Sequence, residues 1–321
     1  MIIQFARVAV MLFAVMLCQA AQAQYPARPI RMLVPNPPGG ATDTLARVIG
    51  PKLAEGLGQP VIVENRPGSN GNLSSELTAR AAPDGYTLLL APDSQIVINP
   101  HLYAKMPVDT VKDLLPVASV VSTQLVLSVN PSLPVKTFAE FVEYARRAHP
   151  PLAYASIGNG SQHHLSMEML KARAGIDLVH VPYKGGGPAT MAILAGEVSA
   201  MVGGNSVAAH IRAGKLRALA LAGRQRSVSY PEVPTMGELY PGLEVTTWLG
   251  IFAPQGVQVP VLARLRAEIN RLLGEADVRE RLRNVGGLDP FVTTPEEFAA
   301  TIRSDFSKYG QVVRAVGATV D

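Results

Sequence analysis

Apolar and polar positions change period several times along the first part of the chain. Five residues from Ile30 to Val34 form an apolar run that predicts a strand. Apolar residues then recur at helical spacing, at Leu45, Val48, Ile49 and Leu53. The pattern predicts a strand, a short loop and a helix with one apolar face. Pro51 lies inside that helix, where a kink or a break is expected.

The same alternation continues to about residue 90. Strands are predicted at 60–63 and 86–90, and a helix at about 72–82 carries Leu73 and Leu77 one turn apart. Strands separated by helices predict a parallel sheet. Ligands gather at the carboxyl ends of such strands, so the loop at 91–94 should lie beside the loop at 37–42.

A second α/β region follows an apolar crossing strand within 116–129. Strands are predicted at 152–155, 178–181, 199–202 and 216–221, and helices at 138–148, 162–174, 188–194 and about 205–213. Three of these strands lead into glycine-rich loops that open helices, at 156–161, 182–187 and 203–206. Repetition at three junctions is stronger evidence than any single junction.

The last third of the chain begins with a return strand within 244–253, followed by helices at 259–273, 276–285 and 295–316. It has no strand–helix alternation of its own, so we expect it to complete the first lobe. The prediction is an α/β fold of two lobes with a cleft between them and hinges near 121–125 and 245–248. Lobe 1 comprises 24–122 plus 247–321, and lobe 2 comprises 123–246.

The loop Pro35–Asp43 has the features of an anion site. Two prolines stiffen it, and Gly39 and Gly40 allow close approach to the backbone. The helix behind it starts with unpaired N–H groups and a positive dipole end, which bind anions without a charged side chain. Asp43 either stabilises the start of its own helix or meets a ligand amine. An ordinary strand-to-helix turn is the alternative.

The N-terminus indicates export. Arg7 precedes an apolar run at 8–17, and Ala21-Gln22-Ala23 follows as a small-x-small cleavage site. Leu17 before Cys18 argues against a lipoprotein, so a signal peptide at 1–23 and a periplasmic mature protein are predicted.

Composition removes several classes of function. Cys18 is the only cysteine, so the mature chain has no thiolate for a metal or a nucleophile. Lys and Arg total 29 and Asp and Glu 25, and losing Arg7 leaves a net charge of +3. No basic cluster suggests nucleic acid. Six scattered histidines give no metal spacing, and the glycine run 185–187 lacks a nucleotide-binding fingerprint. We predict no metal and no cofactor.

A secreted hydrolase using Ser161 with His163 or His164 is the catalytic alternative. Residues two and three apart at a helix start do not face each other as a triad requires, and Gly-x-Ser-x-Gly is absent from the sequence. Ser161 is better explained as a helix N-cap.

Several long motifs resemble one family. They are Tyr25-Pro-x-x-Pro-Ile30, Val34-Pro-x-Pro-Pro-Gly-Gly-x-Thr-Asp43, Val63-Glu-Asn-Arg-Pro-Gly68, Ala155-Ser-x-Gly-x-Gly-Ser-x-x-His-Leu165, Val181-Pro-Tyr-Lys-Gly-x-Gly-Pro188 and Gly214-Lys-Leu-Arg-Ala-Leu219. Together they resemble the solute-binding proteins of tripartite tricarboxylate transporters, the Bug or TctC family. The resemblance covers essentially the whole mature chain and implies a two-lobed periplasmic binding protein of type 2, a Venus flytrap.

The resemblance also implies the binding residues. In the family the loops matching 37–43 and 156–164 hold a carboxylate through backbone amides and waters. Carried over, the contacts are Pro38, Gly39, Gly40, Ala41, Thr42, Ser156, Gly160, Ser161 and His163, with Ser94, Tyr183, Lys184 and Asn205 as further contacts. Asn36 and Gly203-Gly204-Asn205 depart from the family's usual residues, so ligand identity does not transfer.

The expected function is non-catalytic capture of a small organic anion, such as a di- or tricarboxylate, an amino acid or an aromatic acid. A monomer would deliver the ligand to membrane transporter subunits. A sensory subunit that presents its ligand to a receptor kinase is the alternative with the same fold.

Overall fold

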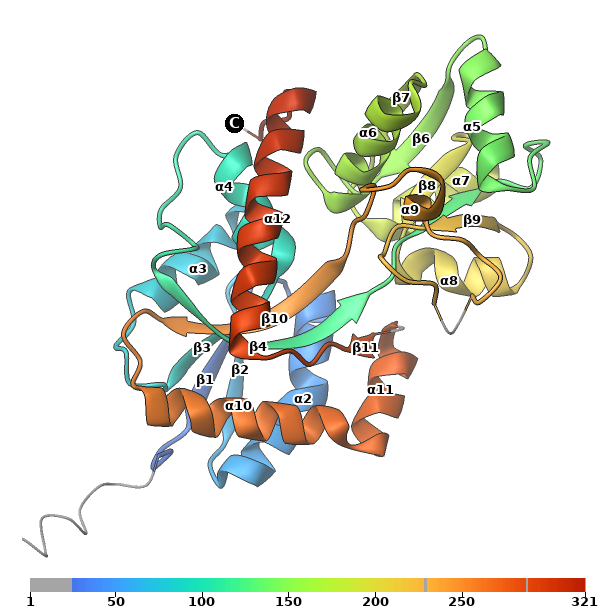
Figure 1. Cartoon of the computed structure of the whole chain (residues 1–321). Coiled ribbons are helices and arrows are strands. Elements are labelled where there is room, and N and C mark those ends of the chain that lie inside the picture. The colour runs from blue at the N-terminus through green and yellow to red at the C-terminus, as the bar shows by residue number, and fades with distance from the viewer. Residues whose placement is uncertain (1–24, 228–229, 287, 321) are drawn as a thin grey trace, which may run out of the picture.

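A six-stranded mixed sheet, ordered β11-β4-β10-β3-β1-β2, forms one lobe of the computed structural model, which describes residues 25–227, 230–286 and 288–320 (Figure 1). Its strands are β1 (Ile30–Val34), β2 (Val61–Asn65), β3 (Thr87–Pro92), β4 (Leu114–Thr123), β10 (Thr247–Pro254) and β11 (Asp289–Pro290). β1 pairs in parallel with β2 and β3, as predicted. β10 runs antiparallel to both β3 and β4.

Alternating side chains of these strands supply two cores, one on each face of the sheet. Met32, Val34, Leu88 and Leu90 join the core under α2 (Ala41–Leu57), α10 (Val259–Gly274) and α11 (Ala276–Gly286). Leu33 and Leu89 face the other core, which contains residues of α12 (Pro295–Val316), the π-helix η2 (Ser94–Ile98) and α4 (Asn99–Leu102). The last third of the chain therefore packs on the first sheet.

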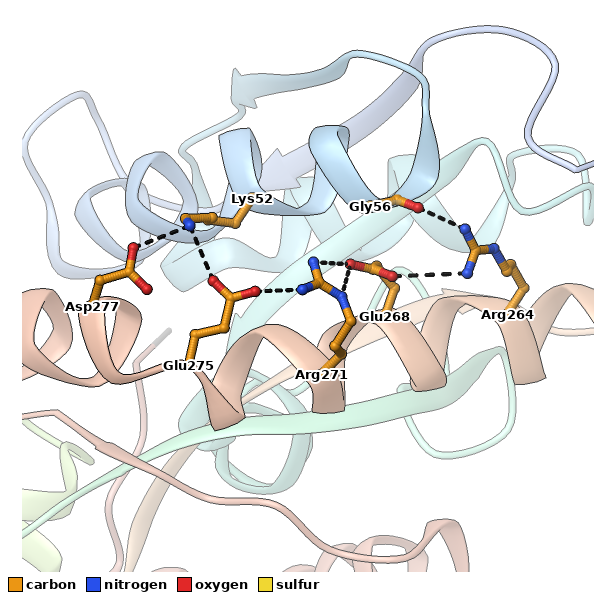
Figure 2. A network of polar contacts seen from close by, with 7 residues as sticks. All are labelled: Lys52, Gly56, Arg264, Glu268, Arg271, Glu275 and Asp277. Carbon is orange, nitrogen blue, oxygen red and sulfur yellow. Dashed lines mark hydrogen bonds and ion pairs between the residues drawn. The ribbon is translucent and has the colours of Figure 1, made fainter.

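A network of ion pairs fastens α2 to α10 and α11 behind the sheet (Figure 2). Lys52 contacts Glu275 and Asp277 at 3.0 Å each, and the buried Glu268 pairs with Arg271 of its own helix. A Cβ on Gly56 would lie 1.7 Å from Oε1 of Glu268, so a larger residue there would displace the Glu268 carboxylate. α2 continues through Pro51 without the break that the sequence allowed. A helix anchored on both sides can lose one N–H bond and continue.

The helix α3 (Asn72–Ala79), preceded by the short 3-10 helix η1 (Ser69–Gly71), presents the opposite face from the one its leucines suggest. Leu73 and Leu77 are 41% and 42% exposed, whereas Ser74, Ser75 and Thr78 are buried. Gln95 of η2 explains the reversal, because its Nε2 donates to Ser74 Oγ, Ser75 Oγ and Gly71 O. Buried hydroxyls are tolerated where such partners exist.

The second lobe is a five-stranded sheet in the order β7-β6-β8-β5-β9. Its strands are β5 (Val126–Val129), β6 (Leu152–Ser156), β7 (Leu178–Pro182), β8 (Ala200–Gly203) and β9 (Arg217–Leu221). Its helices are α5 (Phe138–Arg147), α6 (Gln162–Ala174), α7 (Gly186–Ala195), α8 (Asn205–Arg212) and the short α9 (Met236–Leu239). Figure 1 shows helices on both faces of this sheet.

Two segments join the lobes. The predicted crossing strand is two strands, because β4 ends at Thr123 and β5 begins at Val126. The return passes through Val245, whose N–H donates to Ala222 O, and enters β10 at Thr247. The residue-level lobe boundaries and hinges stay a prediction. The predicted signal peptide lies outside the described residues, and none of the helices that are described is both long and apolar enough to span a membrane.

Candidate functional site

The carboxyl ends of the parallel strands in the two sheets meet at the crossing segments. In the first lobe, Pro92 at the end of β3 pairs with Leu249, close to where β10 enters at Thr247 beside Thr123. In the second lobe, Gly203 at the end of β8 pairs with Val126, the first residue of β5. β6 and β7 run in register with β8, so their ends lie on the same edge. The loops after β1 and β6 therefore each lie at the edge of their own sheet that borders the crossing segments.

The loop after β1 starts a helix that has no side-chain cap. Gly40 is the N-cap residue of α2, with an extended backbone (φ −69°, ψ 162°), and its N–H donates to Pro37 O at 3.0 Å. Pro38 and Gly39 are exposed, and Thr42 in the first turn is buried. A Cβ on Gly40 would lie 2.5 Å from the Cβ of Asn36. The turn leaves first-turn amides to be satisfied by something other than a capping side chain. The side chain of Ala41 lies outside the description.

The side chain of Asp43 stabilises this loop through hydrogen bonds and an ion pair. Its carboxylate accepts hydrogen bonds from Gly39 N at 2.8 Å and from Asn65 Nδ2 at 2.9 Å, and it pairs with Arg47 at 2.9 Å. The hydrogen bond from Arg47 is the main cause that lowers the Asp43 pKa to about 2. Asp43 is only 1% exposed, and both its oxygens are engaged. Of the two predicted roles, these contacts favour stabilisation of its own helix start over contact with a ligand amine.

The loop after β6 starts a helix that is capped in the usual way. Ser161 accepts from His164 N at 3.3 Å and donates to Gly158 O at 2.7 Å. This is the N-cap that the sequence predicted for Ser161. Gly160 has φ +70°, and its N–H donates to His164 Nδ1 at 3.1 Å. The loop is thus held by hydroxyl, imidazole and backbone groups.

Ser156 and the histidines form a neutral cluster beneath this second loop. Ser156 is fully buried, with its Oγ 2.6 Å from His180 Nε2, and the rings of His164 and His180 stack with centroids 3.9 Å apart. Burial lowers the pKa of His180 to about 4, helped by the neighbouring His164. Burial also lowers the pKa of His163 to about 4, and its Nδ1 has no hydrogen-bond partner within the described part of the chain. These groups are neutral at pH 7.

The further predicted contacts are spread along the same edges. Ser94 is half-buried at the start of η2, where its N–H donates to Asp93 Oδ1 at 2.8 Å. Tyr183 N donates to Ser156 O at 3.0 Å, which ties the loop after β7 to the loop after β6. Lys184 is exposed, and Asn205 begins α8 with a side chain that lies outside the description.

The hydrolase alternative lacks its catalytic pair. Ser161 Oγ is engaged with the backbone of Gly158 and His164, and His163 Nδ1 has no partner among the described residues. Ser161 therefore has no base in contact to activate it. No group of three potential metal ligands is present within residues 25–227, 230–286 and 288–320.

Two contacts between the edges were not predicted from the sequence. Gln162 Nε2, in the first turn of α6, donates to Asp93 Oδ2 at the end of β3. A Cβ on Gly160 would lie 2.5 Å from Leu102 of α4. The sequence position of Asp93 indicated a place near the ligand edge of the sheet, because Asp93 directly follows the carboxyl end of a buried strand. Leu102 and Gln162 carried none.

Comparison with known proteins decides the family. The model of the tripartite tricarboxylate transporter family receptor matches residues 45–318. This chain belongs to that family. Its fold and its family are those of non-enzymatic, solute-binding receptors, as the sequence predicted.

Individual relatives cover nearly the whole receptor. Protein BugT of Bordetella pertussis is 39% identical over 297 residues, which are 92% of this chain and 91% of BugT. The structure of R. palustris Rpa4515 with adipate is 30% identical with a TM-score of 0.79, covering 92% of this chain and 99% of that one. MatC of Rhodopseudomonas palustris with bound malate is 34% identical with a TM-score of 0.73, covering 90% and 100%.

Proposed function

We propose that this receptor is exported and captures a small dicarboxylate between its lobes for a tripartite tricarboxylate transporter. The observation that carries the proposal is the placement of the loops Pro35–Asp43 and Ser156–His164 at the sheet edges that border the crossing segments, each opening a helix N-terminus. Each terminus offers backbone N–H groups and a positive dipole end to one carboxylate. A ligand with a carboxylate at each end draws both lobes together.

The charges in the two loops fit this ligand class. Asp43 is the ionised side chain within them, and its charge is matched by Arg47, while the histidines of the second loop are neutral. A carboxylate held there is bound mainly by backbone amides, each worth roughly 1.5–3 kcal/mol to a charged group. Relatives of known structure hold adipate and malate, both dicarboxylates. Asn36 lies within the first loop and is the first position we would change to alter ligand choice.

A matched ligand pair tests the ligand class. Thermal unfolding is measured with adipate or malate and, as controls, with the corresponding uncharged diamides. A ligand present at 100 times its Kd stabilises the folded receptor by about 2.7 kcal/mol. We expect a dicarboxylate to raise the Tm and its diamide to leave it unchanged. Equal effects of acid and diamide, or no effect of any carboxylate in a wider acid screen, would contradict the proposal.

Mass spectrometry tests the remaining parts. Protein purified from its host under native conditions should release a bound organic acid on denaturation. The intact mass of the protein should equal that of a chain beginning at Gln24 if the signal peptide is cleaved after Ala23. A chain that keeps Met1 or Cys18 would contradict export by this signal peptide.

A further inference from the structure

Asp93 is the carboxylate at which the two lobes touch. It is 1% exposed, and its Oδ2 accepts hydrogen bonds from Gln162 Nε2 in the second lobe and from Trp248 N, 3.3 Å away, in the return strand β10. Its Oδ1 accepts from Ser94 N at 2.8 Å. Gln162 follows Ser161 directly, so Asp93 links the second anion-binding loop to the end of β3.

No cation among the described residues pairs with Asp93, and the nearest named one, Lys308, is bound to Asp305. None of the ion pairs formed by the described residues includes Asp93. Asp305 faces it from α12, with its Oδ2 accepting from Trp248 Nε1 at 2.9 Å and its Oδ1 paired with Lys308 at 2.7 Å. Tyr309 of α12 is fully buried, and its hydroxyl has no hydrogen-bond partner in the described chain.

The other titratable groups on the packed elements do not compensate the charge. His101 of α4 contacts Phe306 O at 2.9 Å, and His163 of α6 is neutral. The neighbouring part of η2 and the strand β10 contain no ionisable side chain. Burial, reinforced by the negative charge of Asp305, raises the pKa of Asp93 to about 8.

Opening the lobes changes this environment. Trp248, Asp305 and Ser94 belong to the first lobe and stay with Asp93, whereas Gln162 and α6 belong to the second lobe and move away. Water then reaches the carboxyl group, which favours its ionised form at neutral pH. Closing removes that water and adds the hydrogen bond from Gln162, which favours the ionised form. Loss of water is the larger of these two effects on the pKa of Asp93, so closing favours the protonated form.

We propose that closure of the two lobes takes up a proton at Asp93, so that ligand capture is coupled to protonation of this carboxyl group. The coupling rests on the proposed function, since closure is taken to accompany binding. Its sign follows from linkage. Asp93 binds its proton more tightly in the closed form, so closure is favoured at lower pH and weakens as the pH rises toward about 8.

Interlobe distance measured without ligand tests the coupling directly. Cys18 precedes the predicted cleavage site, so the mature chain accepts a pair of spin labels at introduced cysteines. Leu77→Cys and Met191→Cys suit this purpose, because these side chains are 42% and 64% exposed, one on each lobe. Between about pH 9 and about pH 6.5 the wild type should shift toward the short distance.

Three variants make the result specific. Asp93→Asn should show the same distances at every pH, and the exposed control Asp84→Asn should behave like wild type. Asp305→Asn keeps Asp93 but removes the facing charge, so its transition should move to lower pH. An unchanged transition in Asp93→Asn, or no transition in the wild type, would overturn the proposal.

Calorimetry with adipate gives the second readout. Titrations near pH 7 in buffers of different ionisation enthalpy should show close to one proton taken up per adipate by the wild type and none by Asp93→Asn. Below about pH 8, the wild-type Kd should rise by up to tenfold for each unit by which the pH increases. Adipate binding without proton uptake would contradict the proposed coupling but would still agree with the proposed receptor function. Absence of adipate binding bears only on the ligand, because the distance measurement needs none.

Discussion

The loops after β1 and β6 each lead from a strand into a helix, but an ionised side chain holds the first loop and neutral side chains hold the second. The first loop, Pro35–Asp43, is held by the ionised Asp43 and its partners Arg47 and Asn65. The second loop, Ser156–His164, is held by the Ser161 cap and the neutral imidazole of His164. Ser161 accepts one first-turn N–H of α6, that of His164, whereas no side chain caps the start of α2.

The difference lies in what each loop can tolerate near a bound anion. A carboxylate close to an anion site repels the ligand unless its charge is matched, and Arg47 matches that of Asp43. The neutral second loop has no such requirement, and it is also the loop that touches the opposite lobe, at Leu102 and Asp93. On the proposed function, the first loop is the half of the site that is held within its own lobe, and the second is the half that also contacts the opposite lobe.

Gly160→Ala should separate these roles most strongly. The new Cβ meets Leu102 at 2.5 Å and strains a backbone at φ +70°. We expect ligand affinity to fall at least tenfold, about 1.4 kcal/mol, because the wedge opposes closure, while the strain costs the fold about 1–2 kcal/mol. Calorimetry and denaturant unfolding measure the two effects.

The double variant Gly160→Ala with Leu102→Ala is the control for this wedge. Removing the leucine side chain relieves the clash but leaves the backbone strain, so affinity should recover more than stability does. Equal loss of affinity in the single and double variants would show that the interlobe contact is not responsible.

Asp43→Ala should damage the half of the site that is held within its own lobe. It removes the charged acceptor for the partly buried donors Gly39 N and Asn65 Nδ2, and losing hydrogen bonds to a charged group costs about 1.5–3 kcal/mol of unfolding free energy. Glu143→Ala is the matched control, because its pairs with Arg146 and Arg147 lie on the surface, where such pairs contribute about 0–1 kcal/mol. Similar losses in both variants would mean that Asp43 is an ordinary surface charge.

Ser161→Ala should have a smaller effect. Loss of an N-cap side chain costs about 1 kcal/mol, and Ser161→Thr should retain most of it. The first loop has no side-chain cap at Gly40, so no equivalent loss exists there. An esterase activity that Ser161→Ala abolished would instead revive the hydrolase alternative.

The sequence predicted what depends on local pattern. The helix 162–174 and the helix 295–316 have the predicted bounds, because an N-cap serine or threonine precedes each helix and a left-handed glycine, Gly175 or Gly317, follows it. The N-cap role of Ser161 was readable for the same reason. The sequence predicted that Leu73 and Leu77 form the buried face of α3. That prediction is wrong, because the serine hydroxyls on the other face accept hydrogen bonds from Gln95, which lies about 20 residues away in the sequence.

The contacts between the lobes could not be predicted from the sequence. Gln162 and Asp93 are 69 positions apart, and nothing in either local pattern says that the two edges approach closely enough to touch. The stacking of His164 on His180 joins a helix to a neighbouring strand and has no motif of its own. Such pairings follow from sheet order and lobe orientation, which local periodicity does not encode.

The last and smallest effect concerns the neutral cluster under the second loop. Burial lowers the pKa of His180 to about 4, below the value near 6.5 of an unfolded chain. Between these values the unfolded chain binds more protons than the folded one, so the free energy of unfolding should fall as the pH drops from 6.5 toward 4. At pH 7 His180 is largely neutral in both the folded and the unfolded chain, so its titration changes the free energy of unfolding little there. We expect His180 to titrate near pH 4 by NMR, and His180→Gln, which keeps a hydrogen-bonding group near Ser156 Oγ, to lose stability less steeply on acidification than wild type. A midpoint near 6.5, or identical acid profiles for the two proteins, would show that the second loop is not held by neutral histidines and would remove the chemical contrast between the two loops.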